Sequence, residues 1–471
     1  MAQPAAGAGP QPAPIAVAPP VAAPAGRGVH FGRAAFTAVI ARGAIYVSAA
    51  LSSIVVARAL GPSGKGVFTL AITLGSLFPL LFDLGLSFAA VRAVQERRGE
   101  PRLVFGTALA AYAGLGLVGE ALLLLAGVTL GGSVLRGMTA PVLAATAVGC
   151  VGAYLSIYLT WALVALNQAE RANLAGALGA MLLVPLLGAG FVVLGATPAV
   201  AVVAWTVSAA APVAILGWLT ARAVGWRLRF SIASLRGQMH LAGGPWVYLL
   251  LVALTDRQTT LVVNAVKGSG RLGVYSVAQG FGEMLWQLSF AVGAMLFSKL
   301  SRLDQGRRAE YAAAVTRYAV ALAVPGAVVA CLVARPLIRL LYGADYAGAV
   351  TPFYWLAPGI VAYTVARLLA PDLLVRDRAR GLAAALAGSF VLALALKVWW
   401  TARWGIGGAA AATTVGYLVT AVAVLYLFGR HTGIHPWRAL VVRGEDVRAA
   451  RERLSWAHLR ALVLPGSDHG A

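Results

Sequence analysis

Long apolar runs recur along this chain and constrain its fold more than any other feature. Each run is about 20 residues long, the length at which a helix crosses the roughly 30 Å of membrane hydrocarbon. Hydrophobic residues make up 60% of the 471 residues and charged residues 11%, whereas charged residues are about 25% of a soluble domain. The sequence therefore predicts an all-α polytopic membrane protein.

The apolar runs predict twelve membrane-spanning helices in two groups of six. The predicted spans cover residues 35–57, 67–90, 103–128, 140–165, 174–195, 199–220, 245–265, 274–297, 314–334, 350–370, 381–400 and 406–428. A basic segment, residues 223–244, separates the two groups. We therefore expect an N-terminal lobe of residues 35–222 and a C-terminal lobe of residues 245–428.

One glycine-rich loop occurs twice, 207 residues apart, at the same place in each group. Aligning Gly66 with Gly273 places residues 54–68 on residues 261–275. The match predicts two related halves, and a chance match between sequences of limited composition is the alternative. The first copy, residues 61–66, lacks the leading Gly and the trailing Ser or Thr of a phosphate-binding loop. We therefore expect a helix–helix turn that performs no chemistry.

Lysines and arginines are distributed unevenly between the two predicted sides of the membrane. With the N-terminus inside, 26 of the 38 fall in the tails and inside loops, and eight fall in outside loops. Inside loops of membrane proteins are enriched in these residues, so we expect both termini in the cytoplasm. The same distribution accounts for the net charge of +22, and we expect no nucleic-acid partner.

The ends of the chain and the middle linker have compositions typical of cytoplasmic segments. Residues 1–34 are rich in Ala, Pro and Gly, which predicts a disordered tail, and residues 429–471 form a basic tail. Basic and apolar residues mix in residues 225–240 and 445–463. We expect both as amphipathic helices on an anionic leaflet, with a solvated charged tail as the alternative for the second.

Two arginine–acid pairs are predicted within the membrane by counting residues from the repeated loop. Arg42 and Asp83 flank the first copy at similar depth. Arg257 and Glu283 flank the second copy, nearer the middle of the membrane. A charge in lipid costs several kcal/mol and usually faces a partner or a cavity. Each pair is therefore either a salt bridge or a site where the arginine binds phosphate and the acid takes protons.

Further charged residues within the predicted spans are Asp256, Glu120, Arg367 and Lys397. Asp256, beside Arg257, adds an acid without a predicted partner, and Glu120 in the third span adds another. Both acids are candidates for the group that carries a coupling ion. Arg367 and Lys397 lie close enough to the ends of their spans for their side chains to snorkel to the membrane surface.

Tyr154, Tyr158 and Trp161 recur at helical spacing on the fourth span and form one face. Aromatic rings stack on sugars, so these three residues are candidates for oligosaccharide contact. Core packing or a membrane-interface belt is the alternative. A belt is also expected from five aromatic residues on the outside: Tyr342, Tyr346, Phe353, Tyr354 and Trp355.

No set of residues suited to catalysis or metal binding is evident in the sequence. The two cysteines, Cys150 and Cys331, lie inside apolar runs, and the histidines form no ligand set. The outside loops are too short to build the domain of a membrane glycosyltransferase. We therefore expect no catalytic residues, metal or cofactor.

Two motifs carry a family resemblance. Residues 57–68 read Ala-Arg-Ala-Leu-Gly-Pro-Ser-Gly-Lys-Gly-Val-Phe, and residues 83–92 read Asp-Leu-Gly-Leu-Ser-Phe-Ala-Ala-Val-Arg. They resemble the opening of the polysaccharide biosynthesis (oligosaccharide flippase) proteins, such as O-antigen flippases, of the multidrug/oligosaccharidyl-lipid/polysaccharide exporter superfamily. The likeness extends over nearly the whole pattern of spans. Lipid II flippases, however, look like fourteen-span proteins.

The resemblance implies two six-helix lobes around a central cavity that opens to each side of the membrane in turn. It implies a secondary transporter in the cytoplasmic (inner) membrane that flips isoprenoid-pyrophosphate-linked oligosaccharide to the outer leaflet for surface polysaccharide biosynthesis. The expected partners are this substrate, membrane lipids and other polysaccharide assembly proteins, and the coupling ion is left open between a proton and Na+. Drug–cation exporters rely on cavity acids, whereas the first span here carries Arg42. An ion-coupled multidrug exporter and a membrane glycan polymerase or ligase remain the alternatives.

Overall fold

The computed structural model describes residues 28–96, 99–225, 227–300, 305–375 and 379–441. Residues 1–27 of the predicted tail and the predicted amphipathic segment at 445–463 lie outside these residues. The described residues form helices joined by short turns, without a strand. Nine of the described helices are long and apolar enough to cross a membrane, and three of these, of 43, 40 and 52 residues, are long enough to cross twice.

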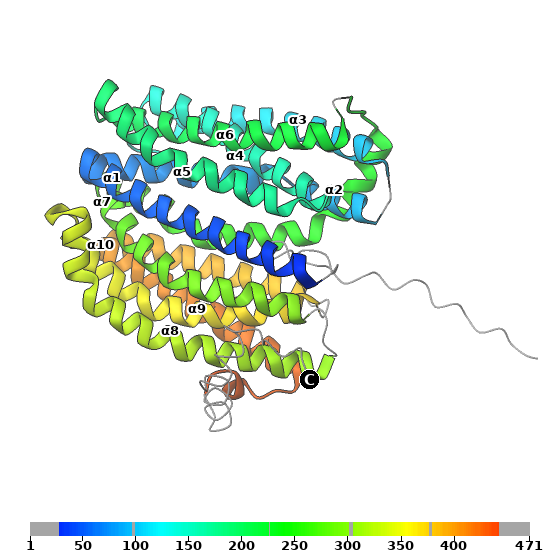
Figure 1. Ribbon diagram of the computed structural model, residues 1–471. Helices are drawn as coiled ribbons and strands as arrows, with labels where there is room; N and C mark the ends of the chain where they lie inside the picture. The colour runs from blue at the N-terminus through cyan, green and yellow to red at the C-terminus, as the bar shows by residue number, and fades with distance from the viewer. Residues whose placement is uncertain (1–27, 97–98, 226, 301–304, 376–378, 442–471) are drawn as a thin grey trace, which may run out of the picture.

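Each of the three longest helices is divided by a glycine with a positive φ. These are α1 (Gly28–Phe82) at Gly61 with φ 64°, α7 (Ile232–Leu300) at Gly268 with φ 80°, and α10 (Ala379–Thr432) at Gly405 with φ 63°. A side chain with a Cβ atom is strained at such φ values, whereas glycine is not. Each glycine therefore allows a hairpin of two antiparallel arms (Figure 1).

The remaining spans are single helices, with three short elements between or after them. The single spans are α3 (Pro101–Leu130), α4 (Ala140–Ala165), α5 (Ala169–Leu194), α6 (Pro198–Val224), α8 (Gln305–Tyr342) and α9 (Val350–Val375). The short elements are α2 (Leu86–Gln95), η1 (Ala344–Ala349) and η2 (Pro436–Ala439). Together with the six arms of the bent helices, the described residues contain the twelve predicted spans. The first spanning arm begins at Gly28, so the last seven residues of the predicted tail, residues 1–34, belong to α1.

The helix boundaries repeat between the two halves of the chain. Helices α4 and α9 are both 26 residues long and begin 210 residues apart. Helix α6 has 27 residues and begins at Pro198, and the second arm of α10, which follows Gly405, begins 208 residues later. Helices of equal length at a nearly constant offset support the two related halves that the repeated loop predicts.

Each half of the chain buries its own apolar core. Leu86, Phe105 and Tyr112 lie in the core of the N-terminal half, and Phe353 and Leu369 lie in that of the C-terminal half. In Figure 1, α3 to α6 stack on one side of α1, and α8 to α10 stack on the other side. The two halves are therefore the two six-helix lobes, with α1 and α7 between them.

The second predicted span, residues 67–90, is broken near its end. Leu84 and Gly85 have φ values of 47° and 81°, which end α1. The Asp83 carboxylate accepts hydrogen bonds from the backbone N–H groups of Gly85 (3.1 Å) and Ser87 (3.2 Å), which begin α2. The second sequence motif therefore specifies a helix break, which the apolar run alone did not predict.

The linker between the lobes is held against the N-terminal lobe. Within the predicted amphipathic segment, residues 227–231 are not helical and α7 begins immediately after them. The Ser231 N–H donates to Thr107 Oγ1 (3.1 Å), and Trp246 Nε1 donates to the Leu80 carbonyl oxygen (2.7 Å). The first turns of α7 therefore pack on helices of the N-terminal lobe before α7 enters the C-terminal lobe.

Candidate functional site

The turns of α1 and α7 lie together at one end of the molecule, called here the hairpin end (Figure 1). A methyl group on Gly66 would overlap the Ser269 carbonyl oxygen, and one on Gly273 would overlap the Pro62 carbonyl oxygen. Gly66 and Gly273 are equivalent positions of the repeat, and so are Pro62 and Ser269. The two copies of the loop therefore make the same contact reciprocally, and only glycine permits this close approach.

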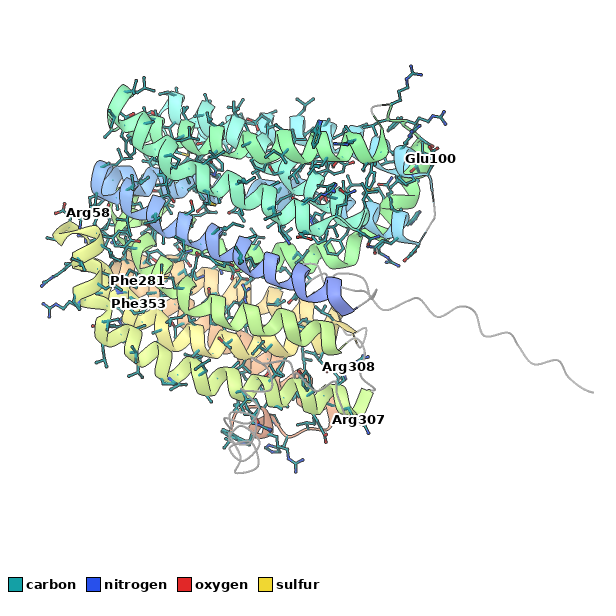
Figure 2. All side chains as sticks on the ribbon, viewed as in Figure 1. Arg58, Glu100, Phe281, Arg307, Arg308 and Phe353 are labelled. Atoms are coloured by element: carbon teal, nitrogen blue, oxygen red, sulfur yellow. The ribbon has the colours of Figure 1, made fainter. Side chains whose placement is uncertain are left out.

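Side chains add further bonds between the lobes at the hairpin end. Arg58 Nε donates to the Leu341 carbonyl oxygen (2.8 Å), and the Tyr346 hydroxyl donates to the Ala57 carbonyl oxygen (3.1 Å). Tyr342, Tyr346 and Phe353 are buried, so the predicted membrane belt is wrong for these three of its five residues. Figure 2 shows Arg58 at the hairpin end, far from the opposite end with Glu100, Arg307 and Arg308.

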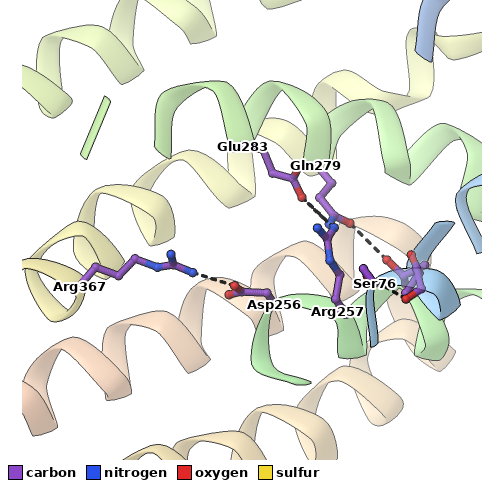
Figure 3. Close-up of polar contacts among 8 residues, drawn as sticks. Ser76, Asp256, Arg257, Gln279, Glu283 and Arg367 are labelled. Carbon is purple, nitrogen blue, oxygen red and sulfur yellow. Dashed lines mark hydrogen bonds and ion pairs between the residues drawn. The ribbon is translucent and has the colours of Figure 1, made fainter. Parts of the chain in front are cut away.

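A chain of hydrogen bonds joins the two arms of α7 away from the turn (Figure 3). Arg257 Nη1 lies 3.1 Å from Glu283 Oε1 in an ion pair. Gln279 Nε2 donates to the same oxygen (3.0 Å), and Thr260 Oγ1 donates to Gln279 Oε1 (3.4 Å). The salt bridge predicted between Arg257 and Glu283 is therefore present.

Lys65 adds a second cation near this ion pair, from the N-terminal lobe. Its side chain is buried, its Nζ lies 5.8 Å from the centre of the Phe68 ring, and its charge interacts with that of Glu283. Sequence reasoning missed Lys65 because it was counted with the outside loop. The signal was its position four residues after Gly61, which places it on the first turn of the second arm.

Arg257 is thus paired with Glu283, and Lys65 is a further, buried cation on the other lobe. The side chains of Arg257 and Glu283 are 35% and 36% exposed although they lie within membrane spans. Charges that faced lipid would be costly, so we infer that the pair faces the space between the lobes. A guanidinium binds phosphate oxygens with paired N–H donors. The arrangement is suited to binding an anion.

Asp256 faces away from this site although it neighbours Arg257. Figure 3 shows the two side chains pointing to different sides of α7, with Asp256 directed toward Arg367 on α9. Arg367 Nη2 lies 2.7 Å from Asp256 Oδ2, and the guanidinium lies 5.0 Å from the centre of the Tyr363 ring. Asp256 is therefore not a spare acid. The predicted snorkelling of Arg367 is wrong, because the ion pair holds its side chain inside the lobe.

Lys397 is buried in the same lobe, on the first arm of α10. Only 1% of its surface is exposed, and its charge interacts with that of Asp256. The predicted snorkelling of Lys397 is therefore also wrong. Its helix is rotated so that this residue faces the lobe interior, which residue counting along a span cannot determine.

The acids of the N-terminal lobe do not form the predicted arrangement. Asp83 is buried, and its described hydrogen bonds come from its own helix break and Ser87. The predicted alternative of a salt bridge with Arg42 is therefore not formed, and Arg42 is half-buried on the first arm of α1. Glu120 is half-buried, and its Oε2 atom has no hydrogen-bond partner among the described residues.

The aromatic face of α4 packs inside the N-terminal lobe. The Tyr154 hydroxyl donates to the Phe82 carbonyl oxygen (3.0 Å), and Tyr158 and Tyr154 are each 2% exposed. Trp161 is half-buried, with its ring 4.9 Å from that of Phe88. The sugar contact predicted for the two tyrosines is therefore replaced by core packing, because these rings fill the space between α3 and α4.

The chain matches one family model, and its fold resembles several solved structures. The model of the family described as polysaccharide biosynthesis protein matches residues 55–351. The inward closed structure of the lipid II flippase MurJ has a TM-score of 0.70 at 14% identity, covering 92% of this chain and 93% of that one. An inward-facing multidrug resistance MATE family transporter of the MOP superfamily has a TM-score of 0.67 at 16% identity, covering 83% and 94%.

A Vibrio cholerae MATE transporter has a TM-score of 0.59 at 13% identity, covering 86% of this chain and 98% of that one. No curated protein sequence matches this chain. The structural identities are low and show the shared fold alone. The family model covers well over half of the sequence, and the chain therefore belongs to the polysaccharide biosynthesis protein family.

Proposed function

We propose that this protein is a secondary transporter that flips an isoprenoid-pyrophosphate-linked oligosaccharide from the inner to the outer leaflet of the cytoplasmic membrane. The observation that carries the proposal is the partly exposed Arg257 guanidinium between the lobes, which is paired with Glu283, while Lys65 adds a buried cation on the other lobe. Family membership and the fold shared with a lipid II flippase support a lipid-linked substrate. A cationic drug would be repelled by the same charges.

The hairpin end faces the outside in this proposal. The distribution of lysine and arginine along the sequence supports this orientation. The reciprocal contact of Gly66 and Gly273 closes the lobes at that end, so the substrate reaches Arg257 from the cytoplasmic side. Separation of the two glycine loops then opens the hairpin end and releases the substrate outward.

The pyrophosphate competes with Glu283 for Arg257. In this conformation Glu283 accepts hydrogen bonds from Arg257 and Gln279, which keeps the guanidinium ordered before the substrate arrives. A pyrophosphate carries more negative charge than a carboxylate and accepts paired N–H donors. Lys65 lies on the opposite lobe, so an anion bound by both cations links the two lobes.

The experiment that tests this function is translocation in reconstituted vesicles. The probe is a fluorescent, short-chain polyprenyl pyrophosphoryl disaccharide, and its outer fraction is measured by quenching with a membrane-impermeant reductant. We expect the native protein to move the probe. Loss of one charge-assisted contact, in Arg257→Gln or Lys65→Gln, should slow movement by about 10- to 100-fold.

A matched control removes a cation from the surface of the same protein. Arg403 is exposed beside Trp399 on α10, and Arg403→Gln should translocate the probe at the native rate. Native rates in both Arg257→Gln and Lys65→Gln would overturn the assigned site. No translocation by the native protein would overturn the function, and joining of labelled glycans would instead indicate a polymerase or ligase.

A further inference from the structure

A cluster of buried charges inside the C-terminal lobe has no role in the anion site between the lobes. It comprises Asp256 on α7, Arg367 on α9 and Lys397 on α10. Asp256 and Arg367 form a close ion pair of 2.7 Å, and Lys397 is 1% exposed. One Asp256 oxygen, Oδ1, is buried without a hydrogen-bond partner among the described residues. The cluster thus has an acceptor that its present bonds do not use.

The charges of this cluster do not balance. Besides Arg367 and Lys397, Asp256 interacts electrostatically with Arg257 and Glu283, whose charges balance in their own ion pair, and with several tyrosines. The tyrosines come from three helices and add no charge: Tyr248 on α7, Tyr363 on α9 and Tyr417 on α10. The described cluster would therefore carry an excess positive charge if both basic groups were protonated.

The chemistry of the two basic groups determines which one can change its protonation state. A guanidinium stays protonated in proteins, whereas a lysine amine can lose its proton when it is buried. An unpaired charge in a protein interior costs several kcal/mol. Arg367 neutralises Asp256 in this conformation, so Lys397 is the group that is stable here without its proton.

We propose that Lys397 exchanges the coupling proton of transport. This proposal rests on the proposed transport function and names the ion that drives it. In this conformation Nζ is a neutral amine and Asp256 is bonded to Arg367. When the hairpin end opens, a proton from the outer solution binds Nζ, and Asp256 turns its unused oxygen Oδ1 toward the new ammonium. On return, the same proton leaves Nζ toward the cytoplasm, while Asp256 stays ionised throughout.

The position of Asp256 links this exchange to the substrate. Asp256 and Arg257 are consecutive residues of α7, one in the buried cluster and the other in the anion site (Figure 3). A displacement of this turn of α7 that moves Arg257 with its bound anion also moves Asp256 relative to Arg367. Binding on one side of the helix is therefore coupled to ion pairing on the other.

The same cluster disfavours a metal cation as the coupling ion. A sodium ion would need several oxygen ligands, and Asp256 is the carboxylate of this described cluster. A proton needs no such set of ligands, because it binds the lone pair of the Lys397 amine. The ammonium that forms then has Asp256 Oδ1 as an acceptor, an atom without a hydrogen-bond partner among the described residues.

The test measures how a pH gradient shifts the distribution of the disaccharide probe between the leaflets. The vesicles contain equal potassium inside and outside with valinomycin, so the membrane potential is held at zero. With one proton entering per probe leaving, a gradient of one pH unit, acid outside, should shift the outer-to-inner ratio about tenfold in the native protein. A sodium gradient at equal pH should produce no shift.

Three variants distinguish the loss of the proton-carrying group from a general defect in the C-terminal lobe. Lys397→Met and Lys397→Arg should both abolish the shift, since neither side chain releases a proton. Lys267→Met is the matched control, because Lys267 is an exposed lysine that donates to the Ala402 carbonyl oxygen (3.0 Å), and it should keep the tenfold shift. Size-exclusion profiles identify any variant that fails to fold, and Lys397→Gln then takes its place.

Three results would overturn the proposal. A pH-driven shift that persists in folded Lys397→Met would exclude Lys397 as the proton carrier. Native translocation that ignores the pH gradient, or that follows the sodium gradient, would exclude proton coupling and leave the proposed flippase function standing. No native translocation of the probe would overturn the proposed function and this inference together.

Discussion

The two lobes share a helical frame but differ in what they bury. The N-terminal lobe stacks Tyr112 on Tyr154 with ring centres 3.8 Å apart, and the C-terminal lobe stacks Tyr363 on Tyr417 at 4.2 Å. Beside its stack, the C-terminal lobe adds the Asp256 cluster, whereas the buried acid of the N-terminal lobe, Asp83, is satisfied by its own helix break.

This difference distinguishes the residues that the helical fold requires from the charged residues that it does not require. A lobe folds with apolar helices, a tyrosine stack and a glycine hairpin, since the N-terminal lobe does so. Buried ion pairs contribute little net stability compared with apolar residues of similar size. The charges of the C-terminal lobe are therefore not required by its architecture, and intramembrane charges of this kind indicate function.

Removal of the buried carboxylate should have the largest effect and sharpen this comparison. Asp256→Asn leaves the buried Arg367 guanidinium without a neutralising charge, and we expect a loss of about 3–5 kcal/mol in the free energy of unfolding. In Asp83→Asn the remaining carbonyl oxygen accepts the Ser87 hydrogen bonds and the Gly85 N–H loses its acceptor, so the loss should be about 1–2 kcal/mol. Denaturation in detergent micelles measures both, and equal losses would contradict the asymmetry between the lobes.

The hairpin end tests the symmetry that the lobes share. An added methyl group on either Gly66 or Gly273 overlaps a carbonyl oxygen of the other lobe, and such overpacking costs about 1–3 kcal/mol. Gly66→Ala and Gly273→Ala should therefore both favour separation of the lobes at that end, and to a similar extent. Gly43→Ala is the matched control, because its methyl group meets no atom within 4 Å.

A disulfide reports this separation directly. A Cβ atom on Gly270 would lie 3.2 Å from Ser63 Oγ, so Ser63→Cys with Gly270→Cys should form a cross-link in the native background. The cross-linking rate should fall by about 5- to 100-fold in Gly66→Ala and in Gly273→Ala. A fall in only one of them would contradict the reciprocal contact.

The smallest expected effect concerns the aromatic face of α4. Tyr154→Phe removes the hydrogen bond to the Phe82 carbonyl oxygen and should lower the free energy of unfolding by about 1 kcal/mol. Because the ring lies in the lobe core, the rate of probe translocation in vesicles should stay unchanged. A translocation defect greater than that of Arg257→Gln would restore the sugar-contact interpretation.

The architecture was predictable because it depends on local sequence patterns. Apolar runs of span length give helices, and glycine at Gly61 and Gly268 gives the two matching turns. The depth of Arg257 and Glu283 followed from counting along these helices, and they form a 3.1 Å ion pair. Distances along a helix axis are fixed by the 1.5 Å rise per residue, so depth needs no tertiary information.

The direction of each side chain was not predictable, because it depends on how each helix is rotated in its lobe. Arg367 and Lys397 were expected to reach the membrane surface, and instead they lie inside the C-terminal lobe. Lys65 was assigned to a loop, and instead it is buried near Glu283. The break at Asp83 had a local signal, since Gly85 two residues later suits a left-handed turn.

The measurement that tests the central claim most directly varies the charge of the transported lipid. Three probes are compared. In the first two, the same fluorescent disaccharide is attached to a short polyprenol through a pyrophosphate or through a neutral ether. The third probe is a lipophilic cationic dye. The proposed function predicts rapid translocation of the pyrophosphate lipid by the native protein, and slow movement of the other two. Equal translocation of the neutral lipid, or preferred movement of the cationic dye, would contradict an anion site at Arg257 and Lys65.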